Sequence, residues 1–179
     1  MESTKPPLTR GIKVSYGVGQ AAECIKNAAF NVFVFFYYTQ VLGLPTVYTG
    51  IAIGIALAVD SITDPLIGSL SDNWRGSNGR RHPFLYASIL PLGLFFIGLF
   101  SPPELGEFAL FAWLTVFSVG TRAMMTLYYV PHVSLGAELS DDFNERTEVV
   151  AYRYFFSYTG GILTFAIGFV VYFPDTQFN

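Results

Sequence analysis

Residues 60–83 read DSITDPLIGSLSDNWRGSNGRRHP, an apolar segment that ends in a short loop rich in arginine. Asp60 and Asp64 are four residues apart, so a helix would place both carboxylates on one face, about one turn apart. An acidic side chain in an apolar membrane helix costs roughly 2.5–3.5 kcal/mol on insertion scales, and it therefore faces a protein interior or a wet cavity. The arginines of the loop mark the cytoplasmic end of the helix. The segment thus predicts a cation site beside a gate loop, as in a secondary transporter.

The composition predicts a polytopic membrane protein of the all-α class. Hydrophobic residues make up 52% of the chain and charged residues only 13%, whereas soluble domains carry about 25% charged residues. The net charge of −3 gives no support for a nucleic-acid partner. The single cysteine excludes an intramolecular disulfide and a multi-cysteine metal site. The chain also lacks a P-loop, a G-x-S-x-G turn and a metal-spaced Cys/His cluster, so we predict that it is not an enzyme.

Five apolar segments are each near the length that crosses a bilayer, which is about 20 residues. The predicted spans are residues 16–42, 49–70, 84–100, 108–135 and 149–173. Lysine and arginine precede the first span and occur between spans two and three and between spans four and five, whereas the opposite loops have none. The positive-inside rule therefore predicts a multi-pass protein of the inner or plasma membrane with a cytoplasmic N-terminus.

Six charged residues fall inside these spans, three acidic and three basic: Glu23, Lys26, Asp60, Asp64, Arg122 and Arg153. One interpretation is a structural network of ion pairs, in which Glu23 pairs with Lys26 on its own helix. The other is a coupling site, because intramembrane charges are functional candidates by default. Two nearby carboxylates can bind Na⁺ with hydroxyl and carbonyl oxygens, or they can share a proton.

Other side chains near these charges could complete a site. Thr63 supplies a hydroxyl next to Asp64. The planar fork of Arg153 could meet an anionic group or the hydroxyls of a sugar. Arg122 could do the same, or it could be a structural partner of one of the acids. Tyr129 could line a pocket, although a tyrosine in a membrane helix also suits the aromatic belt at the interface.

Small residues four apart predict close helix packing at two places. Gly17 and Ala21 lie in the first span, and Gly50 and Gly54 lie in the second. This small-xxx-small spacing lets helix backbones approach one another. The alternative is that glycine is simply frequent in membrane helices.

Three blocks of sequence resemble the glycoside–pentoside–hexuronide:cation symporters, the melibiose-carrier-like branch of the major facilitator superfamily. The blocks are SYGVGQ…FFYYTQVLGL, DSITDPLIGSLSDNWRGSNGRRHP and YVPHVSLGAELSDDFNERT. The resemblance covers nearly the whole chain, and it implies alternating access by two six-helix halves with the sites near the midplane.

The resemblance also implies roles for particular residues. The family's cation site corresponds to Asp60, Thr63, Asp64 and Thr126, with Na⁺ or H⁺ as the coupling ion at the two aspartates. The candidate substrate-binding residues are Arg153, Tyr129, Glu23 and Cys24. Cys24 and Tyr129 stand where sodium-coupled sugar carriers of the family have carboxylates, which puts a galactoside-type substrate in doubt. The gate motif on the cytoplasmic side corresponds to Asp72, Arg75, Arg80 and Arg81.

We therefore expect a cation-coupled symporter of a sugar, a glycoside or a related polar solute, with no organic cofactor. The family has twelve spans, so we expect the chain to be the N-terminal part of a longer carrier whose remaining helices complete the transport path. Its other partner is the lipid bilayer. Two alternatives remain open at this point: a carrier of lysolipids or other amphiphiles with the same fold, and a truncated membrane fragment that does not transport.

Overall fold

The computed structural model describes residues 7–76 and 79–172, and all regular secondary structure in these ranges is helical. The all-α prediction is confirmed. The chain falls into two compact units, which we describe separately. The terminal unit contains residues 1–33 and 136–179, and the central unit contains residues 34–135.

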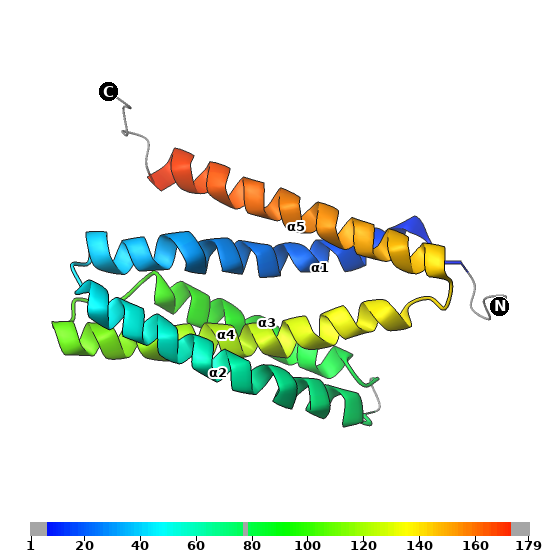
Figure 1. Cartoon of the computed structure of the whole chain (residues 1–179), viewed down its shortest axis with the longest axis horizontal. Coiled ribbons are helices and arrows are strands. Elements are labelled where there is room, and N and C mark those ends of the chain that lie inside the picture. The colour runs from blue at the N-terminus through cyan, green and yellow to red at the C-terminus, as the bar shows by residue number, and fades with distance from the viewer. Residues whose placement is uncertain (1–6, 77–78, 173–179) are drawn as a thin grey trace. The chain divides into compact units, whose positions relative to one another are not determined.

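The terminal unit is a pair of long helices, α1 (Arg10–Ala28) and α5 (Phe143–Tyr172), which pack side by side (Figure 1). Thr9 caps α1, because its hydroxyl oxygen accepts a hydrogen bond from the Ile12 backbone amide at 3.4 Å. After α1 the chain continues into a wider, π-helical segment, η1 (Ala29–Val34).

Small residues allow α1 and α5 to approach each other closely. A β-carbon added to Gly17 would lie 3.0 Å from the carbonyl oxygen of Tyr152, and one added to Gly160 would lie 3.3 Å from the α-carbon of Ala21. Larger side chains at these positions would force the helices apart. The predicted close packing at Gly17 and Ala21 is therefore confirmed.

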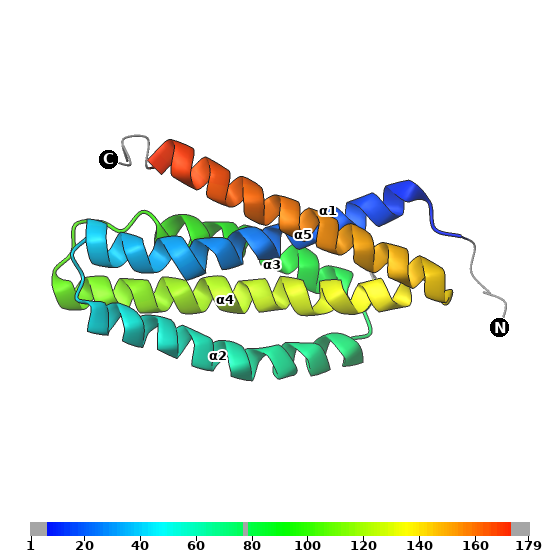
Figure 2. The same ribbon diagram turned by 45° about the horizontal axis from the view of Figure 1, so that its top comes forward.

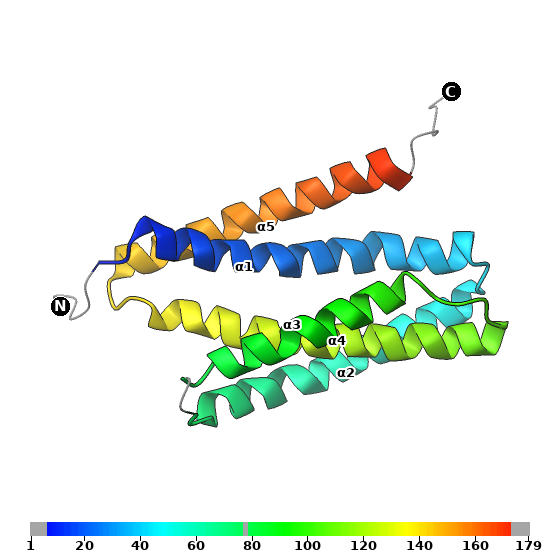
Figure 3. The same cartoon turned by 180° about the vertical axis from the view of Figure 1, so that it is seen from behind.

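The central unit contains the π-helical segment η2 (Tyr37–Val41) and the helices α2 (Thr46–Asn73), α3 (His82–Leu99) and α4 (Glu107–Glu138), with α4 belonging to it as far as residue 135. The helix α4 lies between α2 and α3 (Figure 2). The connection from α2 to α3 and the connection from α3 to α4 lie at opposite ends of these helices (Figure 3). Consecutive helices therefore run in alternating directions, as consecutive membrane spans must.

Three helices of the described part, α2, α3 and α4, are long and apolar enough to cross a membrane. Many of their large apolar side chains are exposed, as at Leu90 (77%) and Phe108 (78%). Contact between such apolar side chains and water is unfavourable, whereas contact with lipid tails is not. Each predicted span overlaps one of the described helical stretches, but the count of five spans stays a prediction.

Two aromatic side chains of the central unit donate hydrogen bonds to backbone carbonyl oxygens of the same unit. The Tyr38 hydroxyl, on a fully buried side chain, donates to the Leu99 carbonyl oxygen at 2.8 Å. The indole N–H of Trp113 donates to the Gly98 carbonyl oxygen at 2.9 Å. Among the described residues, Gly50 and Gly54 have no neighbour within 4 Å of an added β-carbon, so the predicted close packing is wrong for this pair.

Several threonine hydroxyls in each unit bond to the helical stretch that carries them. Five of them donate to the carbonyl oxygen four residues earlier, at 2.7–2.8 Å: Thr39, Thr115, Thr121, Thr159 and Thr164. This back-bonding satisfies a hydroxyl without any neighbouring helix.

Candidate functional site

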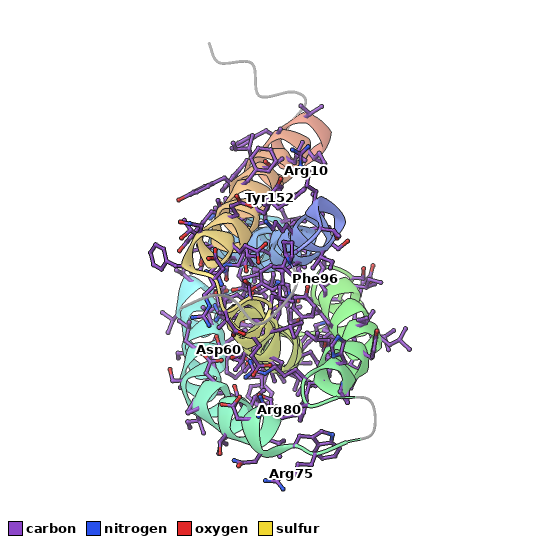
Figure 4. All side chains as sticks on the ribbon, turned by 90° about the vertical axis from the view of Figure 1, so that its right-hand side faces the viewer. Arg10, Asp60, Arg75, Arg80, Phe96 and Tyr152 are labelled. Carbon is purple, nitrogen blue, oxygen red and sulfur yellow. The ribbon has the colours of Figure 1, made fainter. Side chains whose placement is uncertain are left out.

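A threonine hydroxyl of α4 bridges the two aspartates of α2. The Thr126 Oγ1 atom lies 3.0 Å from Asp60 Oδ1 and 2.8 Å from Asp64 Oδ1. Thr126 is buried, Asp60 is half-buried and Asp64 is exposed. The prediction that both carboxylates share one helix face is therefore confirmed. Figure 4 labels Asp60.

The Thr126 hydroxyl lies within hydrogen-bond distance of both carboxylates. A hydroxyl has a single proton to donate, so Thr126 can donate to only one of the two carboxylates at a time. The bridge brings oxygen atoms of two carboxylates and one hydroxyl together, and oxygen atoms of this kind are ligands for hard cations.

Arg122 is the fixed cation next to this pair. Its Nη1 atom lies 2.6 Å from Asp60 Oδ2, and its side chain is 9% exposed, against 21% for Asp60. Of the two roles that the sequence left open for Arg122, the geometry gives it the role of a partner of one acid. Both oxygens of Asp60 are thus engaged, one by Thr126 and the other by Arg122.

Thr63 is turned toward the backbone. Its hydroxyl donates to the carbonyl oxygen of Asp60 at 3.2 Å, one turn back along α2. Pro65 lies inside the same helix and has no amide proton to donate. Among the described residues, no group of three or more His, Cys, Asp or Glu side chains is placed to hold a metal ion. Of the four predicted cation-site residues, Asp60, Asp64 and Thr126 are the ones whose side chains α2 and α4 bring together.

In the terminal unit, two charged residues of α1, Glu23 and Lys26, pair with each other. The Glu23 carboxylate lies 3.3 Å from the Lys26 ammonium, and it also accepts a hydrogen bond from Asn27 at 2.7 Å. The predicted pairing of Glu23 and Lys26 is confirmed. Cys24 is a half-buried free thiol on the same helix, and its sulfur would lie 3.0 Å from a β-carbon added to Gly161 of α5.

The remaining substrate candidates lie on α5 and α4. Arg153, on α5, is half-buried, and its guanidinium carbon lies 5.4 Å from the centre of the Tyr154 ring, a distance typical of a cation–π contact. Tyr129, on α4 of the central unit, is half-buried. Each of the two keeps part of its surface exposed, but their role in binding a solute stays a prediction.

An ion pair joins two residues of the gate motif. Arg81 Nη2 lies 2.9 Å from Asp72 Oδ1, with the arginine side chain 9% exposed and the aspartate 59% exposed. Arg75 and Arg80 are both exposed, and Arg75 projects away from the helices in Figure 4. Residues 77 and 78 of the motif block lie outside the described residues.

A polar cluster at the start of α5 was not predicted from the sequence. Lys13 of α1 lies 2.5 Å from Glu148 and 3.8 Å from Glu145. The hydrogen bond with Glu148 raises the pKa of Lys13 above its usual value. The Ser140 hydroxyl, together with the Leu8 amide, lowers the pKa of the Glu145 carboxyl group. The signal that could have found the cluster is charge complementarity, because a basic N-terminal segment and an acidic loop are predicted on the same membrane side.

The chain matches the family model described as MFS/sugar transport protein over residues 15–178. An uncharacterized symporter of Synechocystis is 30% identical over 85% of this chain and 29% of that protein. An inner membrane symporter of Escherichia coli K12 is 28% identical over 85% of this chain and 33% of that protein. A sodium-dependent lysophosphatidylcholine symporter of Danio rerio is 28% identical over 85% of this chain and 29% of that protein. The chain thus spans about a third of the length of these relatives.

Proposed function

The chain belongs to the family of MFS/sugar transport proteins, in its glycoside–pentoside–hexuronide:cation symporter branch, and from this premise we propose that it takes part in cation-coupled symport of a polar solute. It is a membrane protein. Because it spans about a third of its relatives, we propose the transport activity for a carrier of the relatives' full length that contains this chain. The driving force would be an ion gradient, so no organic cofactor is involved.

The observation that supports this proposal best is the bridge from Thr126 to both Asp60 and Asp64. Two carboxylates bridged by one hydroxyl could share a coupling ion, Na⁺ or H⁺. If ion binding also favours solute binding, the coupling free energy is reciprocal, and the solute must tighten ion binding by the same factor.

A sugar or glycoside is the first candidate for the solute, following the family description. Arg153 would orient it through hydrogen bonds from the guanidinium fork, with Glu23 and Cys24 of the same unit as further candidates, and Tyr129 is a separate candidate on the central unit. A lysolipid is the second candidate, because the Danio rerio relative is named for one. Competition experiments distinguish the two candidates. Related sugars should inhibit uptake by a sugar carrier, and lysolipids should inhibit uptake by a lipid carrier.

The decisive experiment is uptake of labelled solutes by membrane vesicles that contain the longer carrier, under an imposed Na⁺ or H⁺ gradient. Gradient-driven uptake should be lost in Asp64→Asn and retained in Ser61→Ala, a neighbouring control whose hydroxyl donates to the Leu57 carbonyl oxygen of its own helix. Unchanged uptake in both Asp60→Asn and Asp64→Asn would rule out this cation site. No uptake by the wild-type carrier under either gradient would favour the alternative of a fragment that does not transport.

Membrane orientation is a separate part of the proposal. We propose that the N-terminus and the gate loop, with Asp72, Arg75, Arg80 and Arg81, face the cytoplasm of a cell bounded by an inner or plasma membrane. A membrane-impermeant thiol reagent added to intact cells should label Glu104→Cys but not Arg75→Cys, in a chain whose native cysteine is replaced by serine. The opposite labelling pattern would reverse the topology.

A further inference from the structure

Arg122 is the charged group whose place at the site neither the family description nor the motif blocks assign. It lies on α4, one turn before Thr126, and its guanidinium meets Asp60 at 2.6 Å. The same aspartate is one of the two carboxylates that would hold the coupling ion. An arginine is charged at every physiological pH, so this positive charge is a permanent part of the site.

The positive charge of Arg122 lowers the affinity of the site for a second cation. Asp60 and Asp64 carry two negative charges if both are ionised, and the positive charge of Arg122 compensates that of Asp60. Asp60 Oδ2 lies against the guanidinium and Oδ1 lies against the Thr126 hydroxyl. A metal ion such as Na⁺ takes oxygen ligands at short range, so it would compete with Arg122 for the carboxylate oxygens.

Repulsion adds to this competition. A cation that touches the Asp60 carboxylate would lie only a few ångströms from the Arg122 guanidinium. Like charges about 4 Å apart near a protein surface repel enough to lower binding by about a thousandfold before screening. Because Asp60 is 21% exposed and Asp64 is open to its surroundings, screening reduces this factor, and a penalty of about tenfold or more remains.

We propose that Arg122 is a built-in counter-cation that determines ion specificity at this site, by neutralising Asp60 and disfavouring Na⁺ between Asp60 and Asp64. This inference rests on the proposed function for the location of the ion site. In this proposal Arg122 affects the binding of the ion and not the binding of the solute. The chain therefore differs from a carrier in which the paired carboxylates hold a metal ion with no fixed cation beside them.

The test is direct binding of radioactive ²²Na⁺ to the purified full chain in detergent, with K⁺ as the background cation. The wild-type chain should show no saturable binding at millimolar Na⁺. Arg122→Met and Arg122→Gln remove the charge and should tighten Na⁺ binding by about tenfold or more. Arg122→Lys keeps the charge and should show no gain. Adding Asp64→Asn to Arg122→Met should abolish the gained binding, because it removes one of the proposed ligands.

Two results would overturn the inference. One is saturable Na⁺ binding by the wild-type chain that Asp64→Asn abolishes, which needs no Arg122 variant to fold. The other is folded Arg122→Met and Arg122→Gln variants, checked by circular dichroism and gel filtration, that bind Na⁺ no better than the wild type. Binding is measured without transport, so failure of this inference is distinguishable from failure of the symport proposal, which vesicle uptake reports.

Discussion

The ion pair between Asp60 and Arg122 makes a quantitative prediction about stability. The Arg122 side chain is 9% exposed and the Asp60 side chain 21% exposed, with 2.6 Å between the nitrogen and the oxygen. Breaking a fully buried pair by removing one partner costs about 3–5 kcal/mol, because the other charge stays buried. The partial exposure of Asp60 brings our expectation for the coupling free energy down to about 2–3 kcal/mol.

A double-mutant cycle measures this coupling. Asp60→Asn and Arg122→Met should each destabilise the fold, and the double variant should lose about 2–3 kcal/mol less than the sum of the two single losses. The assay is equilibrium unfolding in mixed micelles, followed by circular dichroism. The ion pair between Arg146 and Asp141 is the matched control, since its atoms are 3.9 Å apart and its side chains are 50% and 44% exposed.

The control pair should show a coupling free energy of about 0–1 kcal/mol, as exposed pairs do. The reasoning is refuted if the Asp60–Arg122 coupling is no larger than that of the control. Such a result would mean that the two groups do not share a low-dielectric contact. The argument for Arg122 as a counter-cation would then lose its electrostatic basis as well.

Three further predictions concern packing, hydrogen bonding and pH. Gly160→Leu should destabilise the α1–α5 pair by about 1–3 kcal/mol through overpacking, whereas Gly50→Leu, with no described neighbour within 4 Å, should cost less than half as much in the same unfolding assay. Tyr38→Phe should cost about 1–2 kcal/mol in that assay, because a buried carbonyl oxygen loses its donor. Limited proteolysis should find the start of α1 most protected at intermediate pH. The pKa of Glu145 is lowered from 4.5, so its contribution to stability is complete above pH 4.5 and is lost as the pH falls through the lowered pKa. The pKa of Lys13 is raised from 10.5, so its contribution is complete below pH 10.5 and is lost as the pH rises through the raised pKa. A protease sensitivity that does not change with pH would contradict the last of these.

The helical class and the acidic pair could be predicted because they depend on local sequence. Apolar runs of the right length indicate membrane helices, and the spacing of Asp60 and Asp64 fixes their common face. The pairing of Glu23 with Lys26 was predictable for the same reason, since both residues lie on one helix three positions apart.

Contacts between distant parts of the chain could not be predicted in this way. Lys13 meets Glu148, which lies 135 residues later, and no periodic pattern encodes such a choice of partner. Arg122 could have paired with more than one acid, and only the packing of α4 against α2 selects Asp60. The small-residue rule succeeded at Gly17 and failed at Gly50, because the pattern does not say which helix face meets another helix and which is left to the lipid.

The threonine hydroxyls bear on how mutational scans of this chain should be interpreted. A hydroxyl that bonds to its own helix is already satisfied. Exchanging it for a methyl group, as in Thr115→Val or Thr159→Val, removes only a hydrogen bond to a carbonyl oxygen one turn earlier on the same helix. Thr126 differs because its hydroxyl reaches another helix and touches two carboxylates there. In an isosteric threonine-to-valine series, Thr126→Val should therefore have a larger effect than Thr115→Val or Thr159→Val, because it alone of the three removes a polar connection between two helices. An interpretation that regarded every threonine as part of a polar path would miss this difference.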